Sequence, residues 1–323
     1  QRLELPVVAL GQGRGPPGLG CGGTHGDEDE GQWTAAALCR ELDPSEVAGR
    51  LIVVPTVNRP AALAGRRSSP LDGADINRIF PPRSGGAEGP SAAIARFLWD
   101  QAIRPCDILL DLHSGGGEHE FVLSSNLQGR IGSTASAEDL AALLAMDAPY
   151  AIVFDEIGGE GMPHNGTIEG AARALGKRCF SSELGGGGRL TPESVAAARK
   201  ATLNLLRHVG VLSGPAPGPG GSRLLVLARP EHYLASPVAG LFAPTVRLGQ
   251  AVSECRCEGI LVGSDFKYRV RPPGQALGAV CRLEEPGFPL HGVAAACDGV
   301  VVALVAQARV AAGSTLAMVA VPP

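Results

Sequence analysis

Charged and aromatic residues are scarce in this chain, and their scarcity narrows the classes of protein to which it can belong. Aromatic residues make up 4% of the 323 residues and charged residues 19%, with a formal net charge of −4 and no block of basic residues. A protein that binds nucleic acid through its phosphates needs a basic surface. We therefore expect no nucleic-acid partner, and a core built mainly from Leu, Val, Ile and Ala.

Long apolar runs are absent as well. A membrane-spanning helix needs about 18 or more consecutive apolar residues. Residues 300–321 come closest, but Gln307, Arg309 and Gly313 interrupt them. The first residues lack the pattern of a signal peptide, although the sequence begins at Gln1 rather than Met, so this residue need not be the first codon. We expect no membrane partner.

The cysteines lack the spacing of a disulfide framework or of a structural zinc site. The eight cysteines are scattered, mostly in apolar contexts, which in a chain of this length favours reduced thiols and a cytoplasmic location. Cys255 and Cys257 flank a single residue, and Cys281 and Cys297 do not complete a ribbon-type set of ligands with them.

Several common catalytic motifs are missing. The sequence contains no P-loop and no Gly-x-Ser-x-Gly elbow of a serine hydrolase. Gly18, Gly20 and Gly23 match a dinucleotide-binding pattern in letters only, since prolines precede them and His-Gly-Asp-Glu follows in place of an apolar helix.

Strand-like and helix-like segments alternate through the first two thirds of the chain. A strand over residues 5–10 precedes a Gly/Pro turn, and further strands are expected over 51–55, 107–112 and 178–182, with helices over 32–42, 91–99, 137–146, 167–175 and 194–209. Thr191 and Pro192 are typical of an N-cap and a first helical residue. The alternation predicts an α/β fold in which helices flank the sheet on both faces.

A linker rich in Gly and Pro divides the sequence. It predicts three parts: a catalytic domain over residues 1–213, a linker over 214–221, and a smaller C-terminal all-β domain over 222–323. Short strands are expected there over 224–227, 299–305 and 315–321.

Two imidazoles and a carboxylate stand out as candidate metal ligands. His25 and Glu28 are three residues apart in a Gly-rich turn, and His113 directly follows the buried strand expected over 107–112. A lone His in such a run is usually structural, but this set is that of a catalytic zinc with an open fourth position. We expect one zinc ion per chain. Asp111 could orient an imidazole or accept backbone hydrogen bonds in a loop, and both interpretations stay open.

A candidate general base lies at the end of another buried segment. Glu183 precedes four glycines, and one glutamate can take a proton from an attacking water and then give it to a departing amine. The alternative interpretation of Glu183 is a helix-capping or surface residue.

Substrate contacts are expected from loop residues. Asn77 and Arg78 can bind a substrate carboxylate, and Arg66 or Arg67 can polarise the scissile carbonyl. A turn-forming Asn beside a solvated Arg, and a solvated Arg pair, are the alternatives. His119 and His164 lie in Gly-rich segments from which they could reach a substrate.

The residues 22–28, 75–81, 111–116 and 183–186 together resemble the succinylglutamate desuccinylase/aspartoacylase family of zinc enzymes. The resemblance covers nearly the whole chain. It implies a carboxypeptidase-like mixed sheet with a C-terminal β domain, zinc on His25, Glu28 and His113, a base at Glu183, substrate contacts from Asn77 and Arg78, and a homodimer. Pro70 occupies the family's usual position for the polarising arginine, so Arg67 is the nearest candidate.

Within the family, residues 67–72 and 182–188 look most similar to the branch that degrades ectoine by deacetylating Nα-acetyl-L-2,4-diaminobutyrate. The amine of that substrate calls for an acid nearby, and Asp155, Glu156 and Glu160 are candidates by position. Residues 253–280 look longer and less regular than that branch implies. The alternatives are another N-acyl-amino-acid deacylase, such as an N-succinyl one, a zinc carboxypeptidase, or a non-catalytic protein that binds an amino-acid derivative.

Overall fold

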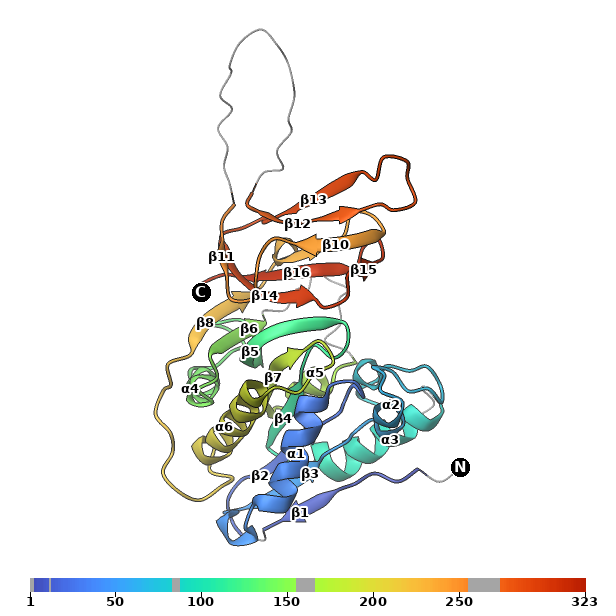
Figure 1. Ribbon diagram of the computed structural model, residues 1–323. Helices are drawn as coiled ribbons and strands as arrows, with labels where there is room; N and C mark the ends of the chain where they lie inside the picture. The colour runs from blue at the N-terminus through green and yellow to red at the C-terminus, as the bar shows by residue number, and fades with distance from the viewer. Residues whose placement is uncertain (1–2, 12, 83–87, 155–165, 255–273) are drawn as a thin grey trace.

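The computed structural model describes residues 3–11, 13–82, 88–154, 166–254 and 274–323 (Figure 1). The part before the linker contains seven strands and six α-helices among these described residues: β1 (Val8–Leu10), β2 (Pro17–Gly22), α1 (Asp29–Glu41), β3 (Arg50–Val54), α2 (Arg59–Leu63), α3 (Pro90–Leu98), β4 (Ile108–His113), β5 (His119–Gln128), α4 (Ala137–Ala145), β6 (Tyr150–Phe154), α5 (Ile168–Arg173), β7 (Arg178–Gly186) and α6 (Pro192–His208). Single turns of helix cover Pro44–Glu46 and Ile76–Arg78, and Trp99–Ile103 extends α3. The predicted helices and the strands at 51–55, 107–112 and 178–182 are confirmed within a few residues.

A mixed sheet runs through the whole described structure. Its strands follow the order β1-β3-β2-β4-β7-β5, in which β3, β2, β4 and β7 are parallel and β5 is antiparallel to β7. Strand β6 pairs with β5 in parallel. The predicted α/β fold class is therefore confirmed. No helix in the described ranges is long and apolar enough to cross a membrane.

Helices cover both faces of this sheet. Successive side chains of a strand point to opposite faces, so neighbouring residues of one strand pack against different helices. In β4, Leu109 packs with Ile94 of α3 and Ile168 of α5. The next residue, Leu110, packs on the opposite face in a cluster that includes Leu143 of α4 and residues of α6. Figure 1 shows α1, α6 and α4 together on the near side of the sheet.

Strand β2 corrects the expectation of a plain turn between residues 10 and 25. It is a central strand in which half of the residues are glycine, and close packing requires Gly22. A Cβ on Gly22 would lie 2.4 Å from the carbonyl oxygen of Gly31, and a Cβ on Gly31 would lie 2.3 Å from that of Leu112. Helix α1 therefore rests directly on the backbones of β2 and β4. The prediction failed because glycine has low intrinsic strand propensity, and only tertiary packing reveals this strand.

Helix α6 begins as its sequence predicts. The hydroxyl of Thr191 accepts a hydrogen bond of 3.0 Å from the backbone N–H of Ser194, and Pro192 is the first helical residue. Such a cap stabilises a helix by about 1 kcal/mol. The helix packs on β7, the strand that carries Glu183, on the face opposite α5.

The segment after the linker forms strands that extend the main sheet and build a second one. They are β8 (Arg223–Leu227), β9 (Tyr233–Ala235), β10 (Gly240–Pro244), β11 (Ala251–Val252), β12 (Ala276–Cys281), β13 (Leu290–Ala294), β14 (Gly299–Val305), β15 (Arg309–Val310) and β16 (Thr315–Ala320). Strand β8 pairs with β6 and β14 pairs with β5, which brings the main sheet to twelve strands among the described residues. A second sheet of four described strands packs against it, at the top of Figure 1. The division into two domains stays a prediction.

Candidate metal centre

The candidate ligands meet where two neighbouring parallel strands, β2 and β4, end. His25 and Glu28 lie in the connection from β2 to α1, and His113 is the last residue of β4. In the next strand, Glu183 lies directly opposite His113 in the pairing of β4 with β7. Glu183 was expected to follow its strand, but it lies within β7 and not at a helix cap, because the pairing continues into the glycines after it. The carboxyl ends of strands are where open α/β sheets bind ligands.

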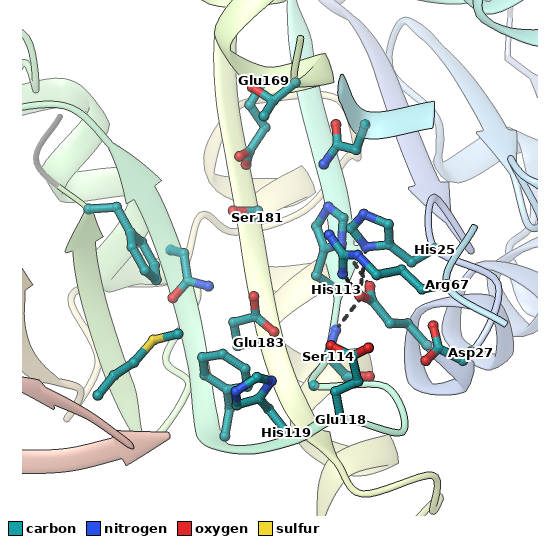
Figure 2. Close-up of a pocket in the computed structure, with 18 of the residues that line it drawn as sticks. His25, Asp27, Arg67, His113, Ser114, Glu118, His119, Glu169, Ser181 and Glu183 are labelled. Carbon is teal, nitrogen blue, oxygen red and sulfur yellow. Dashed lines mark hydrogen bonds and ion pairs between the residues drawn. The ribbon is translucent and has the colours of Figure 1, made fainter. Parts of the chain in front are cut away.

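Two histidines, labelled in Figure 2, converge with one glutamate in the protein interior. The Nδ1 atom of His25 is 2.7 Å from Oε1 of Glu28, and Nδ1 of His113 is 2.7 Å from Oε2 of the same carboxylate. All three residues are buried, and their ligand atoms lie within 4.8 Å of one another. The structure therefore brings together the three residues that the sequence singled out as ligands.

The outer nitrogen of each imidazole faces a second carboxylate. Nε2 of His113 is 2.9 Å from Oδ2 of Asp111, whose other oxygen accepts a hydrogen bond of 2.8 Å from the hydroxyl of Thr24. Nε2 of His25 is 3.3 Å from Oδ1 of Asp75. Of the two interpretations of Asp111, the structure favours the one in which it orients an imidazole. Such outer carboxylates fix the ring and its tautomer, so that Nδ1 is turned toward the ligand position.

The charges of this cluster compensate one another. Burial opposes ionisation of Glu28, yet the charges and hydrogen bonds of His113 and His25 hold its pKa at about 2. Burial likewise opposes protonation of His113, but Asp111 and Glu28 raise its pKa well above the ordinary value. The pKa of His25 is raised by Asp75 and Glu28 against the same effect of burial.

The donor set fits a divalent cation. The carboxylates that draw protons onto the two imidazoles would stabilise a metal ion in the same place, and metal binding displaces such protons. Two imidazoles and one carboxylate leave a fourth position open in a tetrahedral site. The residues present therefore fit a metal ion of the zinc type.

Glu183 lies on the other side of the same cavity. It is partly buried, and its Oε2 is shielded from solvent without a hydrogen-bond partner among the described residues. Burial, and then the negative charge of Glu28, raise its pKa to about 8. A carboxyl group with such a pKa can both hold and release a proton near neutral pH.

The cavity has a volume of about 420 Å³, and the predicted substrate residues line it. Arg67 extends into it, 3.1 Å from Oδ2 of Asp75 and 3.7 Å from Oε1 of Glu28. Arg66 is exposed and does not line it. Asn77 also positions α5, because its Oδ1 accepts a hydrogen bond of 2.8 Å from the backbone N–H of Ile168. Arg78 donates a hydrogen bond of 2.8 Å to the carbonyl oxygen of Asn77.

The structure adds residues that sequence reasoning did not single out. Further polar side chains line the cavity: Asp27, Ser114, Glu118, Asn126, Gln128, Thr167, Glu169 and Ser181. Among them Glu169 of α5 is buried and lies beside Ser181 of β7 (Figure 2). Nothing in its local sequence marks Glu169, since it follows a common helix start, Thr167.

Some sequence-based candidates have other surroundings or fall outside the described residues. His119 lines the cavity, and its Nε2 is 3.1 Å from the carbonyl oxygen of Thr315 in β16. Among the candidates outside the described residues are Asp155, Glu156, Glu160, His164, Cys255 and Cys257.

Sequence comparison identifies relatives of this chain. Residues 18–209 match the profile described as the succinylglutamate desuccinylase/aspartoacylase catalytic domain. The chain is 32% identical over 319 residues to N-alpha-acetyl-L-2,4-diaminobutyric acid deacetylase of Halomonas elongata, and the match covers 98% of this chain and 86% of the relative.

Solved structures with the same fold cover almost the entire chain. A succinylglutamate desuccinylase/aspartoacylase of Rhodobacter sphaeroides superposes with a TM-score of 0.85 at 31% identity, over 99% of this chain and 90% of that one. The product-bound ectoine utilization protein EutE of Ruegeria pomeroyi superposes with a TM-score of 0.84 at 29% identity, over 98% of this chain and 88% of that one. The likeness therefore extends through the C-terminal strands as well as the ligand-bearing part.

Proposed function

The chain belongs to the succinylglutamate desuccinylase/aspartoacylase family, and we propose that it is a zinc-dependent amidohydrolase that deacetylates Nα-acetyl-L-2,4-diaminobutyrate. The observation that carries the proposal is the convergence of His25, Glu28 and His113 in one cavity with Glu183 across from them. The relative from Halomonas elongata, named for this reaction, and the ectoine utilization protein both support the choice of substrate.

The metal would be held by Nδ1 of His25, Nδ1 of His113 and the carboxylate of Glu28. When bound, zinc lowers the pKa of a water molecule and polarises a carbonyl group. Asp111 and Asp75 keep the two imidazoles turned toward that position through their outer nitrogens.

Glu183 would manage the protons of the reaction. Its carboxylate takes a proton from the attacking water at Oε2, the oxygen without a partner among the described residues. It then gives that proton to the nitrogen of the departing amine. Proton transfer in both directions requires a carboxyl group whose two forms are close in free energy, and the raised pKa of Glu183 provides this.

Three further side chains would bind and polarise the substrate. The guanidinium of Arg67 lies beside Glu28, where it can stabilise negative charge that develops on the carbonyl oxygen. Arg78 can bind the substrate carboxylate. Asn77 would donate a hydrogen bond from its amide nitrogen to the substrate, because its oxygen already accepts one from the backbone of α5.

The test is metal analysis of the purified protein together with a screen of acetyl, succinyl and formyl amino acids and of short peptides. We expect about one zinc per chain and the highest kcat/KM for the acetylated diamino acid. Release of C-terminal residues from peptides would identify a carboxypeptidase instead. Binding of amino-acid derivatives without turnover in the zinc-loaded protein would identify a binding protein.

Two further properties follow from the same proposal. We expect a homodimer, which light scattering at several concentrations would test, and a cytoplasmic location, which fractionation of the source cells would test. A monomer at all concentrations would contradict the first, and recovery from outside the cytoplasm the second.

A further inference from the structure

We propose that Glu169 receives the side-chain ammonium group of the substrate, so that it selects diamino acids over neutral ones. This inference rests on the proposed function and extends it from the reaction to the recognition of the side chain. It concerns the end of the cavity formed by β5, β7 and α5, away from the metal ligands (Figure 2).

Glu169 is a buried carboxylate whose hydrogen-bond donors are neutral, while the charges of His113 and Arg173 act on it without forming an ion pair. It is 7% exposed, and its Oε2 accepts a hydrogen bond of 2.8 Å from Nε2 of Gln128. The hydroxyl of Ser181 is a second donor. Within the described residues, no Lys, Arg or His forms an ion pair with Glu169. Buried carboxylates are usually paired with a cation, since an unpaired charge in the interior is costly.

The basic groups nearby are engaged elsewhere. Arg173, one turn further along α5, donates a hydrogen bond of 2.8 Å to the carbonyl oxygen of Thr134. Arg67 contacts Asp75 and Glu28 at the opposite end of the cavity. Residues 155–165, which lie outside the described ranges, include His164 but no Lys or Arg. A cation that enters the cavity is thus the natural partner of Glu169.

The position of Glu169 matches the length of the substrate. Ser181 and Glu183 are two residues apart on β7, so their side chains point to the same face at about 6.6 Å spacing. In an extended Nα-acetyl-2,4-diaminobutyrate, the carbonyl carbon and the side-chain nitrogen are separated by five bonds, or about 6 Å. With the amide at Glu183, the ammonium would therefore reach Ser181 and its neighbour Glu169.

A purely structural role accounts for less of the geometry. As a residue in the first turn of α5, a glutamate would be stabilised equally well with its carboxylate in water. Here the carboxylate is instead directed at the cavity, where burial raises its pKa. The ionised form is stabilised as soon as an ammonium group lies beside it.

The experiment compares two substrates of the zinc-loaded protein, Nα-acetyl-L-2,4-diaminobutyrate and Nα-acetyl-L-norvaline, in which a methyl group replaces the ammonium. We expect Glu169→Gln to lower kcat/KM for the diamino substrate about 10–100-fold, the range of one charge-assisted hydrogen bond. The value for the norvaline derivative should stay within about threefold, because the amide keeps the shape of the side chain. Glu138→Gln, an exposed glutamate of α4, serves as the matched control and should change neither value.

The outcomes separate recognition from folding and from the proposed reaction. An equal loss on both substrates, or no loss on either, overturns the role of Glu169 while the deacetylase function stands. Absence of turnover of any acylated amino acid by the unaltered protein overturns the proposed function. In that event, calorimetry with L-2,4-diaminobutyrate and L-norvaline still tests Glu169, because loss of selective binding in Glu169→Gln supports its role and unchanged binding refutes it.

Discussion

The two walls of the cavity use the same residue type in opposite ways. On the wall formed by the ends of β2 and β4, Glu28 lies between two imidazoles, and its pKa is about 2. On the wall formed by β7 and α5, Glu183 has a pKa of about 8, and Glu169 accepts its hydrogen bonds from the neutral side chains of Gln128 and Ser181. Burial opposes ionisation of Glu28 and of Glu183 alike, so burial alone does not explain the difference. The partners do, since Glu28 lies against two imidazoles, whereas the cations near Glu183 and Glu169 offset burial only in part.

This contrast assigns a different task to each wall. Carboxylates that stay ionised, with histidines held in place by further carboxylates, form a site that can hold a metal ion. Carboxyl groups that lack a cation can exchange a proton or accept a positively charged group from the substrate. The following predictions test whether the two walls are separable in this way.

The largest effect should follow from removing the carboxylate that the two imidazoles share on the wall formed by the ends of β2 and β4, called the metal wall below. In Glu28→Ala the two imidazoles lose the group that they share, and two ligands do not hold zinc tightly. We expect zinc content to fall from about one to below about a tenth per chain, with loss of all measurable turnover. Metal analysis after dialysis is the measurement, with the exposed Glu46→Ala as control. A zinc-replete Glu28→Ala protein would remove Glu28 from the ligand set.

Glu183→Gln tests the opposite wall. An amide cannot accept the proton, so kcat should fall about 10³-fold, within the range attributed to general acid–base catalysis. Zinc content should stay at the level of the unaltered protein, since Glu183 is not among the three clustered ligands. Turnover and metal are measured on the same preparation. Retained turnover would take Glu183 out of the mechanism, and joint loss of zinc and activity would show that the walls are not separable.

Asp111→Asn should have a smaller effect, confined to the metal wall. Asp111 contacts His113 through the nitrogen that does not face Glu28, at 2.9 Å. Loss of such an outer carboxylate typically weakens metal affinity about 10–100-fold. Competition with a fluorescent chelator measures the affinity, and kcat at saturating zinc should fall much less. Unchanged affinity would show that Asp111 does not act on the metal through His113.

The sequence contained most of the metal wall because its residues occur in short motifs. His25 and Glu28 are three residues apart, and His113 and Asp111 are two apart at the end of an apolar strand. Parallel strands bring their carboxyl ends to one edge, so the convergence of these motifs could be predicted from the order of elements. Their predicted roles in binding and catalysis await the experiments above.

The other wall could be predicted only in part. Glu183 precedes a conspicuous run of glycines, but Glu169 and Gln128 come from segments 41 residues apart that meet only in the folded sheet. Strand β5 carries Gln128 and pairs with both β7 and β14, which joins the C-terminal strands to the sheet around the cavity. Such pairings depend on tertiary packing, for which the polar sequence of residues 124–128 gives no local signal.

The smallest predicted effect concerns stability, and it tests the wall formed by β7 and α5 without any substrate. The raised pKa of Glu183 means that the fold favours its neutral form. This contribution to stability is fully present below the ordinary pKa of 4.5 and is lost as pH rises through the folded-state pKa of about 8. Gln cannot ionise, so metal-free Glu183→Gln should be more stable than the unaltered protein at about pH 8.5, by roughly 1–3 kcal/mol at about 1.36 kcal/mol per pKa unit, discounted for partial exposure.

Urea denaturation of both metal-free proteins at about pH 4.5 and about pH 8.5 measures the difference, which should be near zero at the lower pH. Bound zinc should reduce the difference in stability between the two proteins at the higher pH. A divalent cation favours the ionised form of Glu183 and so opposes the effects of burial and of Glu28. Equal stability of the two metal-free proteins at both pH values would mean that Glu183 ionises freely in the fold. The distinction between the walls would then rest on Glu169 alone.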